Sequence, residues 1–233
     1  SNARKVKYMS KANKSNKAIK YRLYPNDEQK VMFAKTFGCC RFVYNQLLAL
    51  QKQRYKDGES HLSKLKSNEF ATRTLKKDYD FLKEIDKFAV SNAVFHLADA
   101  YDRFFKKQNH FPKFKSKRKS KKSYTTNFTN NNILIGKNVI KLPKVGMVKA
   151  VIHKLPKDDW KLKSVTVSQD SVGNYFASVL FEYEQEDIPS VSKSSTNAIG
   201  LDYKSDGLYM DSNGNKAGVH KSVSYTHLTL PTT

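Results

Sequence analysis

Apolar and polar residues alternate over residues 18–24. A period of two predicts a β-strand, and Pro25 ends it. Asn26 then has the pattern of a helix N-cap, with acidic residues in the next turn and Gln29 at the capping-box position. Gly38 lies inside the helical segment that follows and could separate two helices. The apolar residues of this segment recur at steps of four and three, as one helix face does: Phe33, Phe37, Cys40, Tyr44 and Leu47.

Helical periodicity continues beyond this segment and then gives way to strand patterns. A loose apolar repeat runs over residues 67–85 and a regular one over residues 90–104, so four or five helices are expected up to residue 107. From Thr126, short segments rich in β-branched residues are separated by Gly, Asn or Pro, which predicts strands. Residues 170–174 are expected to form a hairpin loop between two of them.

These elements predict an α+β fold with several parts. Residues 18–25 and 126–185 are expected to form a small β-barrel, wedge-like or OB-like, into which a helical, helix-turn-helix-like domain of residues 26–125 is inserted. Residues 186–196 are polar, contain Pro189 and Ser residues, and predict a linker. Residues 197–222 predict a short pair of strands. Residues 223–233 read like one frame of a sequencing-library adapter, and we expect them to carry no function.

The charge balance points to a polyanionic partner. Lys and Arg total 43 against 21 Asp and Glu, which gives a net charge of +22. No apolar run is long enough to span a membrane, and the basic N-terminus lacks the apolar core of a secretory signal. Residues 1–17 are expected to be a disordered basic arm. A cytoplasmic, nucleoid-associated protein fits this composition. The oligomeric state is not predicted.

One segment combines basic and aromatic residues. Between Arg103 and Thr125 there are ten Lys or Arg and no acidic residue. Cations neutralise phosphates, and aromatic rings between them can stack on unpaired bases. The alternative is a solvated charged loop, but Pro112 and the interleaved rings favour an ordered one. The candidate nucleic-acid-binding residues are Lys113, Phe114, Lys115, Lys117, Arg118, Lys119, Lys121, Lys122 and Tyr124.

Metal and catalytic chemistry have one candidate, Asp202, at the end of a predicted strand. Hydrolysis with two metal ions needs several converging carboxylates, so Asp202 alone cannot build such a site. Asp206 and Asp211 lie in turn-rich surroundings and are interpreted as turn formers. The adjacent Cys39 and Cys40 lack the spacing of a zinc site and are expected to be buried in a helix.

Several of these segments resemble the OrfB/TnpB family of insertion-sequence transposases. The strand, proline and helix start of residues 19–29 and the string Arg-Phe-Val-Tyr-Asn at residues 41–45 are similar to the beginning of family members. Residues 100–105, followed by Phe-Pro-Lys-Phe-Lys-Ser-Lys at 111–117, resemble the segment before their second barrel part. Ile-Gly-Leu-Asp at 199–202 matches their first RuvC motif. Together the motifs cover residues 18 to about 220.

The resemblance implies an RNA-guided DNA endonuclease related to type V CRISPR effectors. It implies binding of a guide RNA from the transposon end and of target DNA, with Asp202 as the first catalytic, Mg²⁺-binding aspartate of a RuvC/RNase H-like domain that begins with a β-hairpin in residues 197–222. Tyr203 departs from the glycine that often follows this aspartate. The family's later carboxylates and four-cysteine zinc ribbon have no counterpart, so we expect a C-terminally truncated chain that does not cleave DNA as written.

Two alternatives to this interpretation stay open. The first is a non-catalytic basic module that holds RNA or DNA. The second is a guide-independent DNA transposase, which would bind the ends of its element tightly without RNA. The zinc site is expected only in the missing part, and Mg²⁺ only in the complete protein.

Overall fold

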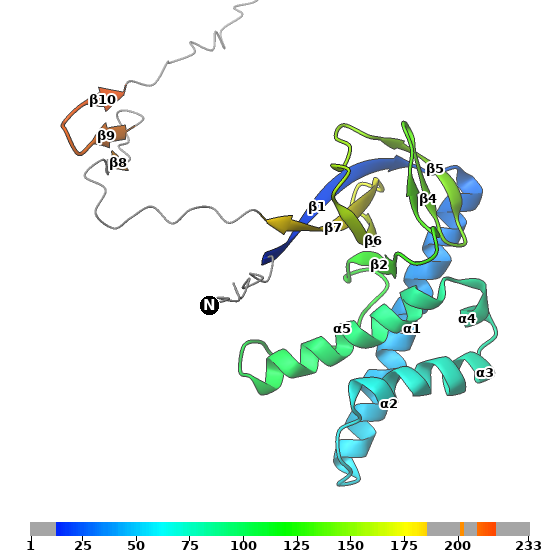
Figure 1. Ribbon diagram of the computed structural model, residues 1–233. Helices are drawn as coiled ribbons and strands as arrows, with labels where there is room; N and C mark the ends of the chain where they lie inside the picture. The colour runs from blue at the N-terminus through cyan, green and yellow to red at the C-terminus, as the bar shows by residue number, and fades with distance from the viewer. Residues whose placement is uncertain (1–12, 186–200, 203–208, 218–233) are drawn as a thin grey trace, which may run out of the picture. The chain divides into compact units, whose positions relative to one another are not determined.

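The computed structural model describes residues 13–185, 201–202 and 209–217. It divides into two compact units, residues 1–186 and 187–233. The basic arm up to residue 12, the predicted linker and the adapter-like end lie outside the described residues. In the first unit, the helices follow β1 along the chain and precede the remaining strands of the same sheet, so the α+β class is confirmed (Figure 1). No helix of the described residues is long and apolar enough to cross a membrane.

The first unit contains a seven-stranded antiparallel sheet with the order β2-β6-β7-β1-β5-β4-β3. The central strand β1 pairs with β7 over residues 13–23 and with β5 over residues 22–24. The strand bounds are β1 Asn13–Tyr24, β2 Lys122–Asn127, β3 Leu134–Ile135, β4 Val139–Leu142, β5 Gly146–Val151, β6 Lys161–Gln169 and β7 Tyr175–Gln185.

β1 and β2 both begin earlier than the sequence predicts. β1 starts at Asn13, so residues 13–17 belong to the sheet and the prediction of a disordered arm up to Lys17 is wrong there. The reason is the partner strand: β7 extends to Gln185 and supplies hydrogen-bonding positions for this basic stretch. β2 starts at Lys122 and pairs with β6 from that residue, so the helical part does not reach residue 125.

The sheet is curled, as the short connection between its two edge strands requires. β2 and β3 are opposite edges, yet only residues 128–133 join them. Six strand spacings in a flat sheet would separate the edges by roughly 29 Å. The connection can span at most about 25 Å when fully extended. The sheet must therefore bend towards closure, although no ladder joins β2 to β3 among the described strands.

The helices begin with one long helix. α1 (Asp27–Lys56) starts at Asn26, whose side chain and that of Gln29 form a reciprocal capping box. Gly38 does not interrupt it, contrary to the break considered from the sequence. A glycine inside a helix costs only about 1 kcal/mol relative to alanine. The buried neighbours Phe37 and Cys39 offset that cost.

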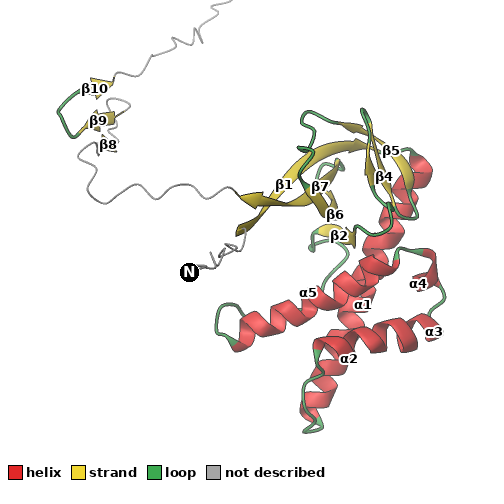
Figure 2. Ribbon diagram, viewed as in Figure 1, coloured by secondary structure: helices red, strands yellow, loops and turns green. Residues whose placement is uncertain are grey.

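Of the remaining helical segments, the last helix makes the most extensive contact with α1, and the others pack mainly against that helix and one another (Figure 2). The segment after the first loop is helical from Lys64 to Asp78, with a π-helical part in its middle. The last helix, α5, starts at the cap residue Asp86. The bounds are α2 Lys64–Glu69, η1 Phe70–Leu75, α3 Lys76–Asp78, α4 Phe81–Glu84 and α5 Lys87–Phe105.

Helices and sheet share one hydrophobic core. The Phe33 ring on α1 lies 5.4 Å from the Tyr175 ring on β7 and 6.3 Å from the Tyr124 ring on β2. The buried hydroxyl of Thr126 donates a 2.6 Å hydrogen bond to Asp86, the N-cap of α5. The helical segment is thus not an independent domain attached to a barrel, because its caps and core residues are completed by the sheet.

The second unit is described only in part. β8 (Leu201–Asp202), β9 (Tyr209–Asp211) and β10 (Lys216–Ala217) form a small antiparallel sheet in the order β10-β9-β8. Residues 211–214 form a turn between β9 and β10, in agreement with the interpretation of Asp211 as a turn former. The Gly214 amide donates to the Asp211 carbonyl at 3.0 Å, and Gly214 has a φ of 83° that favours glycine.

Candidate nucleic-acid interface

A basic loop, residues 106–121, connects α5 to β2. It begins with a chain reversal at Lys107, which has a φ of 56°. The amides of Lys107 and Gln108 donate to the carbonyls of Phe104 and Arg103 at 2.9 and 2.8 Å, so these two carbonyls in the last turn of α5 are satisfied. This reversal turns the loop back along the helices.

The Asn45 side chain on α1 fastens the middle of the basic loop. Its amide nitrogen donates to the Lys115 carbonyl at 2.9 Å, and its oxygen accepts from the Lys115 amide at 2.8 Å. The Lys115 ammonium lies 4.1 Å from the centre of the Tyr44 ring, and burial lowers its pKa. Pro112 is also buried. The loop is therefore ordered by contacts with α1. The Lys115 side chain contributes mainly to packing against Tyr44 and less to the exposed basic surface.

A short turn displays the most basic part of the loop. The hydroxyl of Ser116 accepts from the Lys119 amide at 2.9 Å, and the hydroxyl of Ser120 accepts from the Ser116 amide at 2.9 Å. These bonds fold residues 116–120 into a turn whose Lys117, Arg118 and Lys119 side chains are exposed. Lys113 and Lys121 are exposed as well.

A small hollow of about 30 Å³ lies between α1 and the basic loop. Five of its lining residues are basic and three are serines, while none is acidic. Such a set of positive charges and hydroxyl donors suits a phosphate group. The basic lining residues besides Lys115 are Arg41, Lys117, Lys121 and Lys122, and the serines are Ser116, Ser120 and Ser123. We call this hollow the phosphate cleft.

Arg41 lines the phosphate cleft, but it is not among the binding residues predicted from the basic segment of the sequence. It lies on α1, about seventy positions before the loop, and no basic run surrounds it. The only sequence feature that marks Arg41 is the Arg-Phe-Val-Tyr-Asn string at residues 41–45, of which it is the first residue. The structure shows that this string and the basic loop are in contact, because Asn45 binds Lys115.

The aromatic candidates divide into exposed and buried rings. Phe114 is 51% exposed, and the Lys52 ammonium lies 4.7 Å from its ring centre. Tyr124, in contrast, is 3% exposed and packs against Phe33 and Phe37. The prediction that Tyr124 stacks on bases is wrong, because the strand β2 turns alternate side chains inward and Tyr124 is one of them.

The charges of the basic segment are not neutralised within the protein. Among the described residues, no carboxylate forms an ion pair with any Lys or Arg of residues 103–122. Lys122 instead donates to the Gln169 side chain at 3.1 Å. These cations remain available to phosphates, whose binding releases condensed counterions.

A second basic and aromatic group lies on the exposed side of β1 and β7. The Lys20 ammonium lies 4.1 Å from the Phe176 ring centre, and the Arg22 guanidinium lies 5.0 Å from it. Arg22 also contacts the Asn174 side chain. Sequence reasoning assigned these residues to a strand without noting that their outward side carries cations over a ring.

Asp202 is exposed on β8 and does not meet another carboxylate among the described residues. It pairs with Met210, whereas Asp211 pairs with Leu201. Directly opposed residues share a face and successive residues alternate, so Asp202 and Asp211 point to opposite faces of this sheet. Asp211 is a turn former as predicted: the Asn215 side chain and nearby amides hold the pKa of Asp211 below its usual range.

The described residues therefore do not make a magnesium site on their own. No group of three or more His, Cys, Asp or Glu suited to a metal ion occurs among them. Cys39 and Cys40 are buried on α1, and burial raises the pKa of Cys39 to about 11 and that of Cys40 to about 12. Thiols with such pKa values are poor metal ligands and poor nucleophiles at neutral pH.

The basic loop is ordered against a long helix, and cations without a carboxylate partner among the described residues surround a small cleft between them. These features define a nucleic-acid-binding type of protein. The comparisons agree with this class. The model of the OrfB/IS605 helix-turn-helix domain matches residues 15–60. In the structure this span comprises most of β1, all of α1 and the start of the loop that leads to α2.

Three curated relatives align with the chain. One, from Streptomyces pristinaespiralis, carries the name RNA-guided DNA endonuclease and is 30% identical over 86% of this chain and 49% of its own length. InsQ of Escherichia coli K12, with the same description, is 29% identical over 79% of this chain and 44% of its own length. Virulence protein VsdF of Salmonella dublin is 32% identical over 43% of this chain and 93% of its own length.

The chain belongs to the OrfB/TnpB family of insertion-sequence transposases. It spans about half the length of the two endonuclease relatives.

Proposed function

We propose that this chain is the nucleic-acid-binding part of a transposon-encoded, RNA-guided DNA endonuclease, and that the basic loop and the phosphate cleft hold the backbone of the guide RNA. The observation that carries the proposal is the convergence of Arg41 with Lys117, Lys121 and Lys122 around a cleft with no acidic lining residue. The names of the two endonuclease relatives support RNA and DNA as the partners.

The cleft binds a phosphate through geometry as well as charge. Arg41 offers a planar fork of donors from a rigid helix, while the serine hydroxyls supply neutral donors from the loop. The loop is already ordered by Asn45, so little conformational entropy is lost when RNA binds. Exposed rings beside the loop then stack on bases that are not paired.

Asp202 would supply one carboxylate of a RuvC-like, Mg²⁺-dependent nuclease site that begins in residues 197–222. Its support is the Ile-Gly-Leu-Asp motif and the antiparallel pairing of β8 with β9. Magnesium prefers carboxylate and water oxygens, and two-metal hydrolysis of phosphodiesters needs more than one carboxylate. Further ligands would lie outside the described residues.

A filter-binding titration tests the RNA proposal. Structured RNA from the end of the element and the corresponding double-stranded DNA are compared at several salt concentrations. The logarithm of affinity should fall with the logarithm of salt by roughly 0.7–0.9 per neutralised phosphate. Replacing Lys117, Arg118 and Lys119 together by alanine should reduce this slope by roughly 2–2.7.

A matched control removes three exposed lysines elsewhere, namely Lys149 on β5 and Lys137 and Lys157 in the loops that connect strands. This control variant should keep the slope of the parent protein. Equal slopes for the parent and the loop variant would show that the basic loop does not contact the phosphates of the RNA. Binding to the element-end DNA that equals or exceeds binding to RNA would favour the guide-independent transposase instead.

A further inference from the structure

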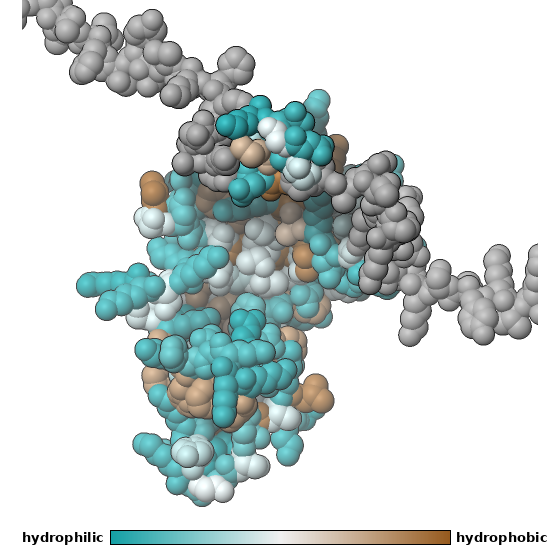
Figure 3. Space-filling view, turned by 90° about the vertical axis from the view of Figure 1, so that its left-hand side faces the viewer, coloured by the Kyte–Doolittle hydropathy of each residue, from teal (hydrophilic) through white to brown (hydrophobic). Residues whose placement is uncertain are grey.

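An aromatic pocket lies at the end of the helical part, next to the basic loop. Its volume is about 580 Å³, within the range of small-ligand sites. Side chains from the end of α1, the loop before α2, the end of α5 and the basic loop line it. Its aromatic residues are Tyr55, His61, Tyr101, Phe104, Phe105 and Phe111. Figure 3 shows hydrophobic side chains framed by hydrophilic ones in this lower, helical half of the molecule.

The rings line the sides of an open pocket and do not form a closed core. Tyr101 is buried and forms the floor, with the Phe111 ring edge-on at 5.6 Å and the His61 ring edge-on at 4.5 Å. Phe105 is 61% exposed and Tyr55 is 84% exposed. Tyr55 makes no ring contact with any other described residue. Leaving such large rings in water forgoes the stabilisation that burial would give them.

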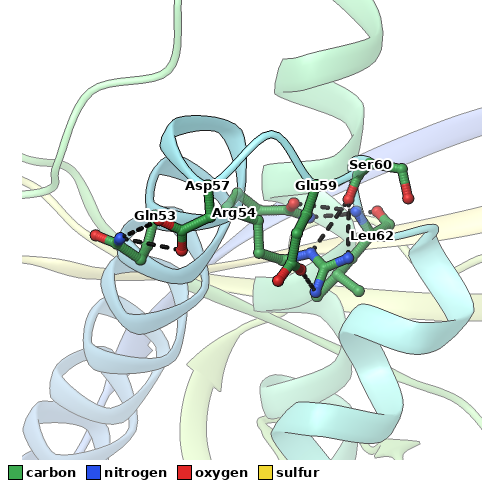
Figure 4. Close-up of polar contacts among 7 residues, drawn as sticks. Gln53, Arg54, Asp57, Glu59, Ser60 and Leu62 are labelled. Atoms are coloured by element: carbon green, nitrogen blue, oxygen red, sulfur yellow. Dashed lines mark hydrogen bonds and ion pairs between the residues drawn. The ribbon is translucent and has the colours of Figure 1, made fainter.

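The pocket is held in shape without a ligand. The Gln51 side chain, which is buried, accepts from the Leu62 amide at 3.1 Å and donates to the Leu62 carbonyl at 3.2 Å. The Arg54 guanidinium donates to the Ser60 carbonyl at 3.1 and 3.0 Å and also forms an ion pair with Glu59 (Figure 4). These bonds fix the loop that carries His61, and they neutralise the acidic residue of the lining.

The charge around the pocket identifies the chemistry of its occupant. Lys52 and Lys56 belong to the lining, and the Lys52 ammonium lies 5.5 Å from the Phe111 ring centre and 4.7 Å from that of Phe114. Phe111 thus belongs to both the pocket and the basic loop. A planar apolar group joined to a phosphate fits flat rings bordered by cations, and it reaches the pocket along a path already lined with positive charge.

We propose that this aromatic pocket takes an unpaired nucleobase of a single-stranded RNA segment whose backbone follows the basic loop. The proposal rests on the proposed function, because it assumes that RNA lies on that loop. Tyr55 and Phe105 supply the stacking faces, and Lys52 and Lys56 contact the phosphates on either side. Every base has a π-face, so the pocket tolerates different bases.

The test uses the full chain and single-stranded RNA that contains the fluorescent base 2-aminopurine. Stacking on the rings should quench the fluorescence of the probe when it binds. Tyr55→Ala should remove the quenching and weaken binding by about 5- to 150-fold, the effect of losing one stacked base. The salt slope should not change, because no charge is removed. Tyr55→Trp should restore both signals.

A matched control replaces Phe81, an exposed ring of α4 that lies outside the pocket and is 41% exposed. Phe81→Ala should leave quenching and affinity as in the parent. If the parent binds RNA with a steep salt slope but Tyr55→Ala binds equally well, the pocket proposal fails while the proposed function stands. If the parent binds no RNA, both fail. A dimer in sedimentation that dissociates in Tyr55→Ala would show that a second copy occupies the pocket, and would overturn the proposal.

Discussion

Replacing Asn45 by alanine should have two effects: it should loosen the basic loop, and it should weaken RNA binding. Asn45 makes two hydrogen bonds to the backbone of Lys115, at 2.9 and 2.8 Å, across 70 residues of sequence. Each such bond contributes about 0.5–1.5 kcal/mol net, so the free energy of unfolding should fall by about 1–3 kcal/mol. The Lys115 amide and carbonyl would lose their partner in a partly buried place, which argues for the upper half of this range.

The measurement is denaturant unfolding, followed by the RNA titration with the same variant. Gln53→Ala is the control, because Gln53 lies on the same helix and its amide also makes two hydrogen bonds, to Asp57 at 2.8 and 3.1 Å. Those bonds are local and exposed, so the control should lose no more than about 0.5 kcal/mol. Amide hydrogen exchange at Lys115 should accelerate in Asn45→Ala and not in Gln53→Ala.

Two outcomes would refute this reasoning. If Asn45→Ala unfolds at the same denaturant concentration as Gln53→Ala, the two hydrogen bonds do not hold the loop. If it is destabilised but binds RNA with the affinity and salt slope of the parent, the order of the loop does not matter for binding. In the second case Arg41 and the lysines would act as a flexible set of charges.

Two further predictions concern side chains whose burial the structure reveals. Tyr124→Phe should leave RNA binding unchanged, whereas Tyr124→Ala should destabilise the protein by about 3–5 kcal/mol because it leaves a cavity between helices and sheet. Unfolding curves and the RNA titration check both, and a binding defect in Tyr124→Phe would contradict the core assignment. Cys39 and Cys40, with pKa values raised to about 11 and about 12, should resist a thiol reagent at pH 8 in the native protein and react after denaturation. Fast labelling of the native protein would contradict their burial.

Local patterns predicted the elements well where the cause is itself local. The alternation in β1 places Ile19, Tyr21 and Leu23 in the core, and all three are buried. The capping box at Asn26 forms as the spacing indicates. The loop at residues 170–174 closes through hydrogen bonds to the Asp170 side chain from the amides of residues 172 and 174. In each case the interacting groups are a few residues apart.

Predictions failed where a distant partner decides the outcome. The basic composition of residues 13–17 favours a disordered arm, but pairing with β7 makes them a strand. Tyr124 follows a basic run and looks like a stacking residue, yet the β2–β6 register turns it inward. Arg41 has no basic neighbour to mark it, and only the contact between α1 and the loop brings it to the phosphate cleft. None of these partners can be identified from the pattern within one segment.

The way in which the basic loop is ordered has a consequence for its salt response. Its hydrogen-bonded anchors are neutral groups, namely the Asn45 amide and the hydroxyls of Ser116 and Ser120, and the Pro112 ring is buried. Salt screens interactions between exposed charges but has little effect on hydrogen bonds between neutral groups. The shape of the phosphate cleft therefore survives at salt concentrations that release RNA. The slope of a salt titration then reports how many phosphates the cations neutralise, and not the unfolding of the loop that presents them.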